Sequence, residues 1–167
     1  MATSLAVTFS LNVRAVNTNT LDLGTVVDSI NETFSDSLTN GTTDNMADQS
    51  WADTRTLAAT SEDLDLGGGI TNGFGTALTM AKIRSITIKN NNTTSGHTLS
   101  IGGATANAIS TLFANTSDII VIKPNGLLHI EAPTDGYAVT TATADLLKID
   151  AGANTVVYDI IVVGTSA

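Results

Sequence analysis

The sequence predicts an all-β protein, an antiparallel β-sandwich of jelly-roll-like type with long loops and little helix. Apolar and polar residues alternate with a period of two through most of the chain, which is the pattern of half-buried strands. Candidate strands recur at intervals of about 8–12 residues with turn-forming residues between them, as in sandwiches and barrels. A helical period is weak throughout, and only residues 104–113 allow one short helical turn.

The N-terminal part contains the most regular candidate strand. Its alternating apolar residues are Leu5, Val7, Phe9, Leu11 and Val13. A run rich in Ser and Thr follows, in which Ile30, Phe34 and Leu38 share one parity. This run ends at Asn40-Gly41, a typical turn signal. We therefore expect extended structure both in the first strand and in the run that ends at Asn40.

The rest of the chain contains short candidate strands joined by turns. They lie near Leu57 and over residues 62–66, 78–89, 98–101, 118–123, 127–131, 137–140, 146–150 and 155–163. Pro124-Asn125-Gly126 has the residue types of a tight turn. Gly67-Gly68-Gly69 favours a long loop over a domain linker, because the strand pattern continues on both sides. We expect a single domain over residues 1–167. Its parts are acidic N-terminal strands or an arm with loops (1–66), a glycine-rich loop (67–79) and a jelly-roll core half (80–167).

The chain is acidic and has no cysteine. It holds 16 acidic and 7 Lys or Arg side chains, a formal net charge of −9. Residues 1–66 carry ten acidic and two basic side chains, a net charge of −8, whereas residues 67–167 carry six and five, a net charge of −1. A surface that binds a phosphate backbone needs clustered Lys and Arg, so we expect no nucleic-acid partner. Because the sequence shows no long apolar run and no signal peptide, we expect no membrane partner either.

Catalytic constellations are missing from the sequence. Only His97 and His129 offer an imidazole base, and we interpret His97 as a surface loop residue and His129 as a solvated strand residue. Asp63 to Gly67 begins like an EF-hand loop, but its twelfth position is Phe74 instead of an acid. An oxygen-rich loop at residues 43–48 stays open as an alternative calcium site. We expect no enzyme, no catalytic residues, no cofactor and no metal.

The composition instead favours a rigid structural protein that assembles. Thr and Val suit pleated sheets, and small polar side chains allow close packing between sheets and between subunits. The first strand is apolar on one face, which invites aggregation unless a partner covers it. We predict that residues 1–40 contact other copies or a shell protein. The candidate contact residues are Leu5, Val7, Phe9, Leu11, Arg14 and Arg55, of which the two arginines are isolated cations in an acidic half.

Six segments of the C-terminal half carry a family resemblance. They are Ala81–Asn90, Leu99–Gly103, Ile122–Leu128, Ala132–Thr140, Thr143–Ile149 and Val157–Gly164. In order and character they resemble the jelly-roll half of small virion proteins of tailed bacteriophages. The likeness covers about half of the chain and consists of strand and turn signatures, while residues 1–79 match only in general character. Asn125-Gly126 stands where the family often has two glycines, which leaves the turn intact.

The resemblance implies a capsid decoration (cement) protein. Such a protein would be a homotrimer on the outer capsid surface, would bind the major capsid protein and would stabilise the shell. Its location would be the virion, after synthesis in the host cytoplasm. The alternative is a head-fibre, tail or baseplate component whose exposed loops contact a receptor or glycan. The candidate residues for such loops are Asn91, Asn92, His97, Asp135 and Tyr137.

Overall fold

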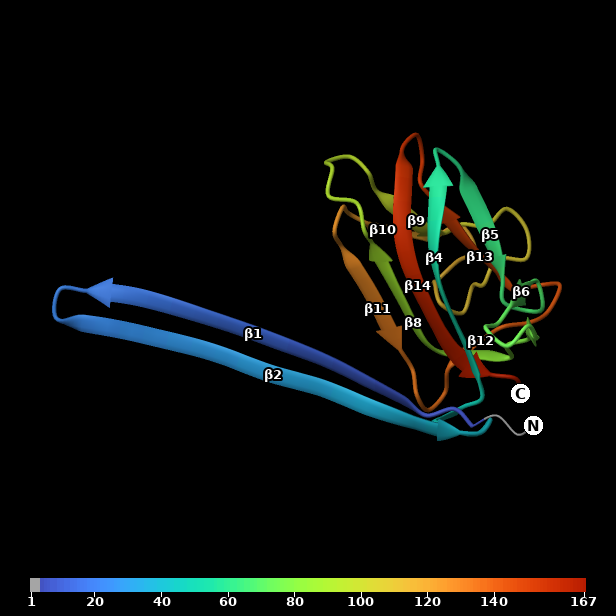
Figure 1. Cartoon of the computed structure of the whole chain (residues 1–167), viewed down its shortest axis with the longest axis horizontal. Helices are drawn as coiled ribbons and strands as arrows, with labels where there is room; N and C mark the ends of the chain where they lie inside the picture. Colours follow the sequence, from blue (N-terminus) through green and yellow to red (C-terminus); the bar gives the residue numbers. More distant parts are fainter. Residues whose placement is uncertain (1–3) are drawn as a thin grey trace.

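The computed structural model describes residues 4–167, and these residues form an all-β protein, as the sequence predicts. Figure 1 shows two parts, a sandwich body and a long two-stranded hairpin that projects from one end of it. We call this hairpin the arm. The described residues contain no helix, and therefore none that could cross a membrane.

The body consists of two antiparallel sheets that face each other. The five-stranded sheet has the order β11 (Leu127–Glu131), β8 (Lys82–Asn90), β14 (Thr155–Thr165) and β4 (Gln49–Ala58), with β12 (Tyr137–Ala138) also paired to β8. The four-stranded sheet has the order β10 (Ile119–Ile122), β9 (Leu99–Gly102), β13 (Leu146–Asp150) and β5 (Ser61–Asp65). Neighbouring strands come from distant parts of the chain, so the sandwich depends on long-range pairing.

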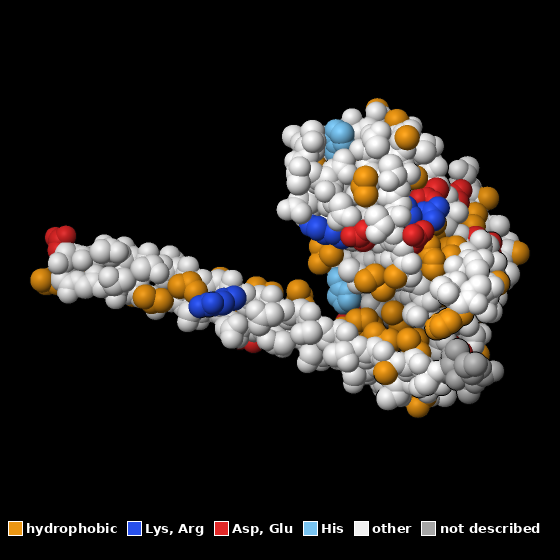
Figure 2. All heavy atoms as spheres, viewed as in Figure 1, with side chains coloured by type: hydrophobic (Ala, Val, Ile, Leu, Met, Phe, Trp, Pro, Cys, Tyr) orange, Lys and Arg blue, Asp and Glu red, His pale blue; other side chains and the backbone are white. Residues whose placement is uncertain are grey.

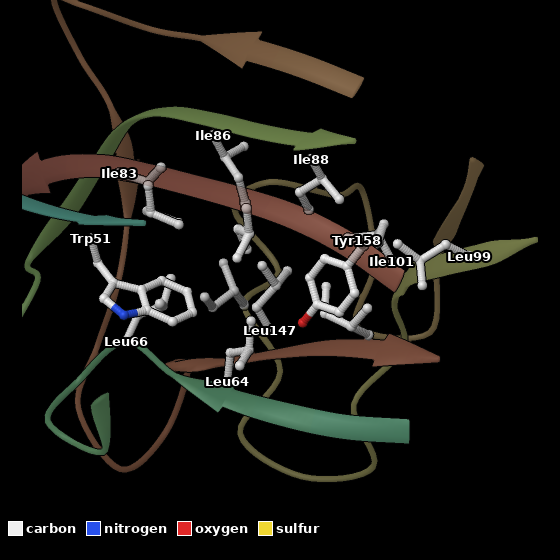
Figure 3. Close-up of a cluster of buried hydrophobic side chains, with 14 of the residues drawn as sticks. Trp51, Leu64, Leu66, Ile83, Ile86, Ile88, Leu99, Ile101, Leu147 and Tyr158 are labelled. Atoms are coloured by element: carbon white, nitrogen blue, oxygen red, sulfur yellow. The ribbon is translucent and has the colours of Figure 1, made fainter. Parts of the chain in front are cut away.

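The core lies between these two sheets and follows from the period-two pattern. Ile86 and Ile88 of β8 point inward beside Tyr158 of β14, and all three are fully buried. Leu64, Leu99, Ile101 and Leu147 meet them from the four-stranded sheet (Figure 3). Burial of one such aliphatic side chain contributes about 1.5–3 kcal/mol. The body therefore has a sufficient core of its own, without help from the arm.

Arg84 anchors two loops at the end of the body from which the arm leaves. Its side chain is fully buried. Its guanidinium donates hydrogen bonds to the backbone carbonyls of Thr43, at 2.9 Å, and Thr134. These loops lie directly after the arm and directly before β12, so the buried arginine fixes the chain just after the arm ends.

The arm pairs β1 (Val7–Leu21) with β2 (Gly24–Asn40) in one uninterrupted antiparallel register, from Val7 opposite Leu38 to Leu21 opposite Gly24. The short strand β3 (Met46–Ala47) pairs in parallel with the last two residues of β2. A small second core holds the base of the arm to the body. It consists of buried Leu38, Ala47 and Val163, with Leu5, Val7 and Phe9 packed against them.

The remaining segments differ in part from the sequence predictions. Residues 104–113 form no helical turn, because the carbonyl of Asn107 accepts from Leu146 at 2.9 Å and the amide of Ile109 donates to Leu146 at 3.1 Å. These bonds tie the segment to β13 instead of closing a helix. The glycine-rich segment 67–79 contains a short hairpin of β6 (Ile70–Thr71) and β7 (Ala77–Leu78). The strand expected over 78–89 is interrupted at Met80, whose amide bonds to Leu66.

Candidate functional site

The register of the arm divides it into two chemically different faces. Side chains alternate between the faces of a sheet, and directly paired residues share a face. The apolar face carries Val7, Phe9, Leu11, Val13, Ala15 and Leu21 of β1 and Val26, Ile30, Phe34 and Leu38 of β2. The polar face carries mainly Ser, Thr and Asn, together with Arg14, Val16 and Val27. The apolar face also holds three carboxylates in β2, those of Asp28, Glu32 and Asp36.

The arm displays an unusual amount of apolar surface. Nine of the fourteen exposed large hydrophobic side chains of the described chain lie in residues 7–40, and six of these nine are on the apolar face. A two-stranded hairpin alone is marginally stable in water. Contiguous exposed apolar surface on a soluble protein marks an interaction site. The arm is therefore a candidate contact element.

A groove opens where the arm leaves the body (Figure 2). Its volume is about 720 Å³. One wall is the apolar face of the arm at Phe9, Leu11 and Phe34, and the other is the outer face of the five-stranded sheet at Leu127 and Ile161. Leu11, Phe34, Leu127 and Ile161 are all exposed. The lining also includes the carboxylates of Asp36 and Glu131, so the groove has largely apolar walls with acidic groups among them.

His129 lies in β11 at the inner end of this groove, and its side chain is 25% exposed, less than a fully solvated strand residue would be. Its Nδ1 atom is 2.8 Å from the Thr87 hydroxyl, and its Nε2 atom is 3.1 Å from the Glu131 carboxylate. The ring also packs against Phe9, with centroids 5.8 Å apart. These contacts hold the imidazole between arm and sheet.

The structure separates the predicted contact residues into three environments. Leu5, Val7 and Phe9 are half-buried against the body at the base of the arm. Leu11 is exposed on the apolar face, and Arg14 is exposed on the polar face. The parity of the first strand therefore identified the apolar face of the arm, and the first residues of this face pack against the chain's own body. Residues 1–3 of the predicted contact segment 1–40 lie outside the described residues.

Arg55 belongs to the body and is not an isolated cation. Its Nε donates to Glu62 at 2.8 Å, and its Nη1 donates to Asp53 at 2.9 Å. The hydrogen bond with Glu62 is the main reason that the pKa of Arg55 is raised. Glu62 also accepts a 2.7 Å hydrogen bond from the Tyr158 hydroxyl. These contacts assign Arg55 to a network that joins β4, β5 and β14.

The candidate loop residues do not form one surface. Asn92 donates to the Thr155 carbonyl at 2.9 Å and accepts from the Val157 amide at 2.8 Å, so its side chain joins the loop to β14. His97 lies 3.0 Å from the same Thr155 carbonyl. Tyr137 pairs with the first half of β8 and packs against the core. Residues 91–97 follow the opposite end of β8.

Two of the loop residues are exposed, Asn91 and Asp135. The 2.6 Å hydrogen bond from the Thr54 hydroxyl is the main reason that the pKa of Asp159 is lowered, and the Asn91 side chain adds to this effect. Asp135 lies in the turn that begins at Ala132, closed by the hydrogen bond from the Gly136 amide to the Ala132 carbonyl. The two residues lie at opposite ends of β8, so they do not belong to one common site.

The remaining surface of the described chain offers little chemistry. Residues 4–167 contain no group of three or more acidic or His side chains placed to hold a metal ion. A second hollow of about 310 Å³ is lined by Trp51 and by the Arg55 network. No family model matches the chain, and neither a curated protein nor a solved structure matches it. The arm and the groove at its base are therefore the main candidate site. The sequence analysis predicted contacts over residues 1–40, but it did not predict the paired hairpin or the groove.

Proposed function

We propose that this chain is a structural protein of a phage virion, a decoration protein that binds the outer surface of the capsid and stabilises the shell. The observation that carries the proposal is the arm, a long ribbon with one apolar face that the chain itself leaves uncovered. Such a ribbon reaches well beyond its own body. A protein of this shape can bridge neighbouring units of a lattice, where many modest contacts add through multivalency.

The charge distribution supports the same role. The described arm, residues 7–40, carries four acidic side chains and one Arg. An acidic ribbon is repelled by nucleic acid, whereas a protein surface with apolar patches and basic rims attracts it. The major capsid protein is the partner that this reading assigns, together with other copies of the chain in a homotrimer.

The decisive measurement is the copy number of the protein in purified particles encoded by the same genome. Quantitative mass spectrometry is expected to give a fixed, high ratio to the major capsid protein, and cryo-electron microscopy is expected to place the density on the capsid exterior. Absence from the particles would refute the proposal. A few copies located at the tail or baseplate would refute it in favour of the alternative tail or head-fibre role.

A further inference from the structure

We propose that the groove at the base of the arm receives the arm of a second copy of this chain. Each copy then donates its arm to one neighbour and accepts an arm from another. This inference concerns the chain by itself and does not depend on the shell to which the protein binds. It identifies the surface through which copies join.

The first argument is continuity with packing that already exists within one copy. At its base, the apolar face of the arm packs through Val7 and Phe9 onto Val163, at the end of β14. Farther along, the same face continues with Leu11 and Phe34, which are exposed and line the groove. The sheet opposite continues with Ile161, also exposed. Both walls of the groove therefore continue the apolar contact that exists at the base of the arm, but farther along no side chains fill the space between them.

The second argument is the chemical match between the arm and the groove. The distal part of the apolar face repeats the pattern found at the base, with Ile30 and Val26 continuing the row of Leu38 and Phe34. The carboxylates of this face need hydrogen-bond donors wherever the arm is covered. The groove lining holds Thr87 and His129, which are hydrogen-bonded to each other, and the carboxylates of Asp36 and Glu131. The match between a second arm and the groove is therefore one of apolar surface, and the carboxylates of that arm have to stay at the solvent-exposed rim.

The third argument is size. A strand of 15 residues such as β1 is about 50 Å long, whereas the 11 residues of β14 span about 36 Å. The arm is therefore long enough to cross a body of this size. The base of the apolar face is already packed on the body, so the free stretch of β1 runs from Leu11 to Leu21 and is about 37 Å long. For a ribbon about 10 Å wide, this stretch and an equal partner surface amount to about 740 Å² of flat area, the size of a small and weak interface.

The free edges of the arm also indicate that it needs a defined partner. In the described chain, β1 has β2 as its only neighbour, and β3 covers only Thr39 and Asn40 of β2. Long unpaired edges next to apolar side chains promote uncontrolled pairing between chains. Seating each arm in a groove of a neighbour gives the apolar face one defined partner. A ring of copies closes this head-to-tail contact.

The test compares two double variants with matched exposure. Val26→Asp/Ile30→Asp changes side chains on the apolar face that are 57% and 52% exposed, whereas Val27→Asp/Val16→Asp changes side chains on the polar face that are 59% and 52% exposed. Light scattering after size exclusion is expected to give an oligomer for the wild type and the polar-face variant. It is expected to give the mass of a single chain for the apolar-face variant.

The groove side has its own matched pair. Ile161→Asp changes a groove residue that is 49% exposed, and Ile119→Asp changes a residue of β10, on the other sheet, that is 54% exposed. Only Ile161→Asp is expected to give single chains. Fluorescence of Trp51, the single Trp of the chain, reports whether each variant keeps its core. If a variant does not fold, the cross-linking measurement takes its place, because single cysteine substitutions leave both surfaces otherwise intact.

Cross-linking uses the absence of cysteine from the sequence. An Ile30→Cys variant is mixed with a Leu127→Cys variant, and a short bismaleimide reagent is added. Two-chain products are expected in large excess over the same mixture with Ser29→Cys, which lies on the polar face beside Ile30. Equal yields from the two arm positions would overturn the proposal.

Two further results would overturn it. One is a wild-type chain that is a single copy at about 100 μM, well above the micromolar Kd at the weak end of such interfaces. The other is an oligomer that persists in both the apolar-face and the Ile161→Asp variants. These assays use the isolated chain, whereas the decoration role is tested on particles. A single-copy chain that still coats particles would leave the decoration role standing and assign the arm to the capsid protein.

Discussion

Shortening the arm tests whether the body is an independent folding unit. We consider a variant in which residues 12–33 are replaced by Asn-Gly, so that Leu11 and Phe34, which are directly paired, flank a two-residue turn. Asn-Gly is the sequence preferred for such turns. The variant keeps Leu38, Ala47 and Val163 at the base and removes only the projecting part.

The expected change in the free energy of unfolding of the body is small. Every residue from 12 to 33 is exposed. The side-chain hydrogen bonds of Asn12 run to Asn31 and Thr33 within the arm. Removal of such surface residues typically changes stability by less than about 0.5 kcal/mol. In contrast, Leu38→Ala removes a side chain that is 1% exposed and is expected to cost about 2–5 kcal/mol.

The assay is urea unfolding followed by the fluorescence of Trp51 in the core. Association would add to the stability of the wild type, so the full-length reference is the Val26→Asp/Ile30→Asp variant. A shortened chain that loses about 2 kcal/mol or more relative to this reference would refute the separation of arm and body. An unchanged stability of Leu38→Ala would refute the anchoring role of the small core at the base.

Two further predictions concern the body. Tyr158 is buried and donates to Glu62, and burial first, then this hydrogen bond, raises the pKa of its hydroxyl. Since the unfolded pKa is about 10, the stabilisation is complete below pH 10 and is lost as the pH rises above it. Tyr158→Phe is therefore expected to cost about 1–3 kcal/mol at pH 7, and urea unfolding should show this difference shrinking above pH 10; a constant difference would contradict the assignment. Gly164 lies at the irregularity in the pairing of β14 with β8, and a Cβ atom there would lie 2.1 Å from the Lys82 carbonyl oxygen. Gly164→Ala is expected to lower the free energy of unfolding by more than about 2 kcal/mol, as measured by thermal unfolding. Gly24→Ala is the control and should be neutral, because nothing lies within 4 Å of a Cβ atom at that position. Equal effects of the two substitutions would count against the close approach at Gly164.

The sequence was sufficient to predict the fold class because most of the strands bury one face against a single core and leave the other face exposed. Strict alternation identifies which residues point inward, as at Ile86, Ile88 and Tyr158. Boundaries were less certain where hydrogen bonds to distant strands decide the conformation. Residues 104–113 illustrate this, since their backbone is bonded to Leu146, a partner that no local pattern reveals.

The arm was only half predictable for a physical reason. The alternation of Leu5 to Val13 indicated a strand with one apolar face, but nothing local indicated that it continues to Leu21 and returns directly. The polar residues Asn17 and Asn19 interrupt the apolar face there. The shared parity of Ile30, Phe34 and Leu38 indicated one face of a second strand, but not that Val26 extends this face or that the two strands pair directly.

Loop residues were the weakest part of the sequence reasoning. Asn92 and His97 are polar and lie in a polar loop, which made them candidates for contact with a partner. In the structure both meet the Thr155 carbonyl and fix the loop against β14. Polar side chains in loops often satisfy the backbone of neighbouring strands, and sequence alone does not separate that role from recognition.

The carboxylates of the arm restrict the ways in which copies of this chain can associate. Stacking two arms through their apolar faces would bury six carboxylates in one layer, those of Asp28, Glu32 and Asp36 from each copy. The one cation of each arm, Arg14, lies on the opposite face and cannot compensate them there. Burying unpaired charges is costly. An arm seated in the groove brings its three carboxylates beside Asp36 and Glu131 of the receiving copy, so these charges have to stay at the solvent-exposed rim. The acidic residues that make the N-terminal half so strongly charged therefore oppose the stacking of bare arms and limit how deeply an exchanged arm can sit.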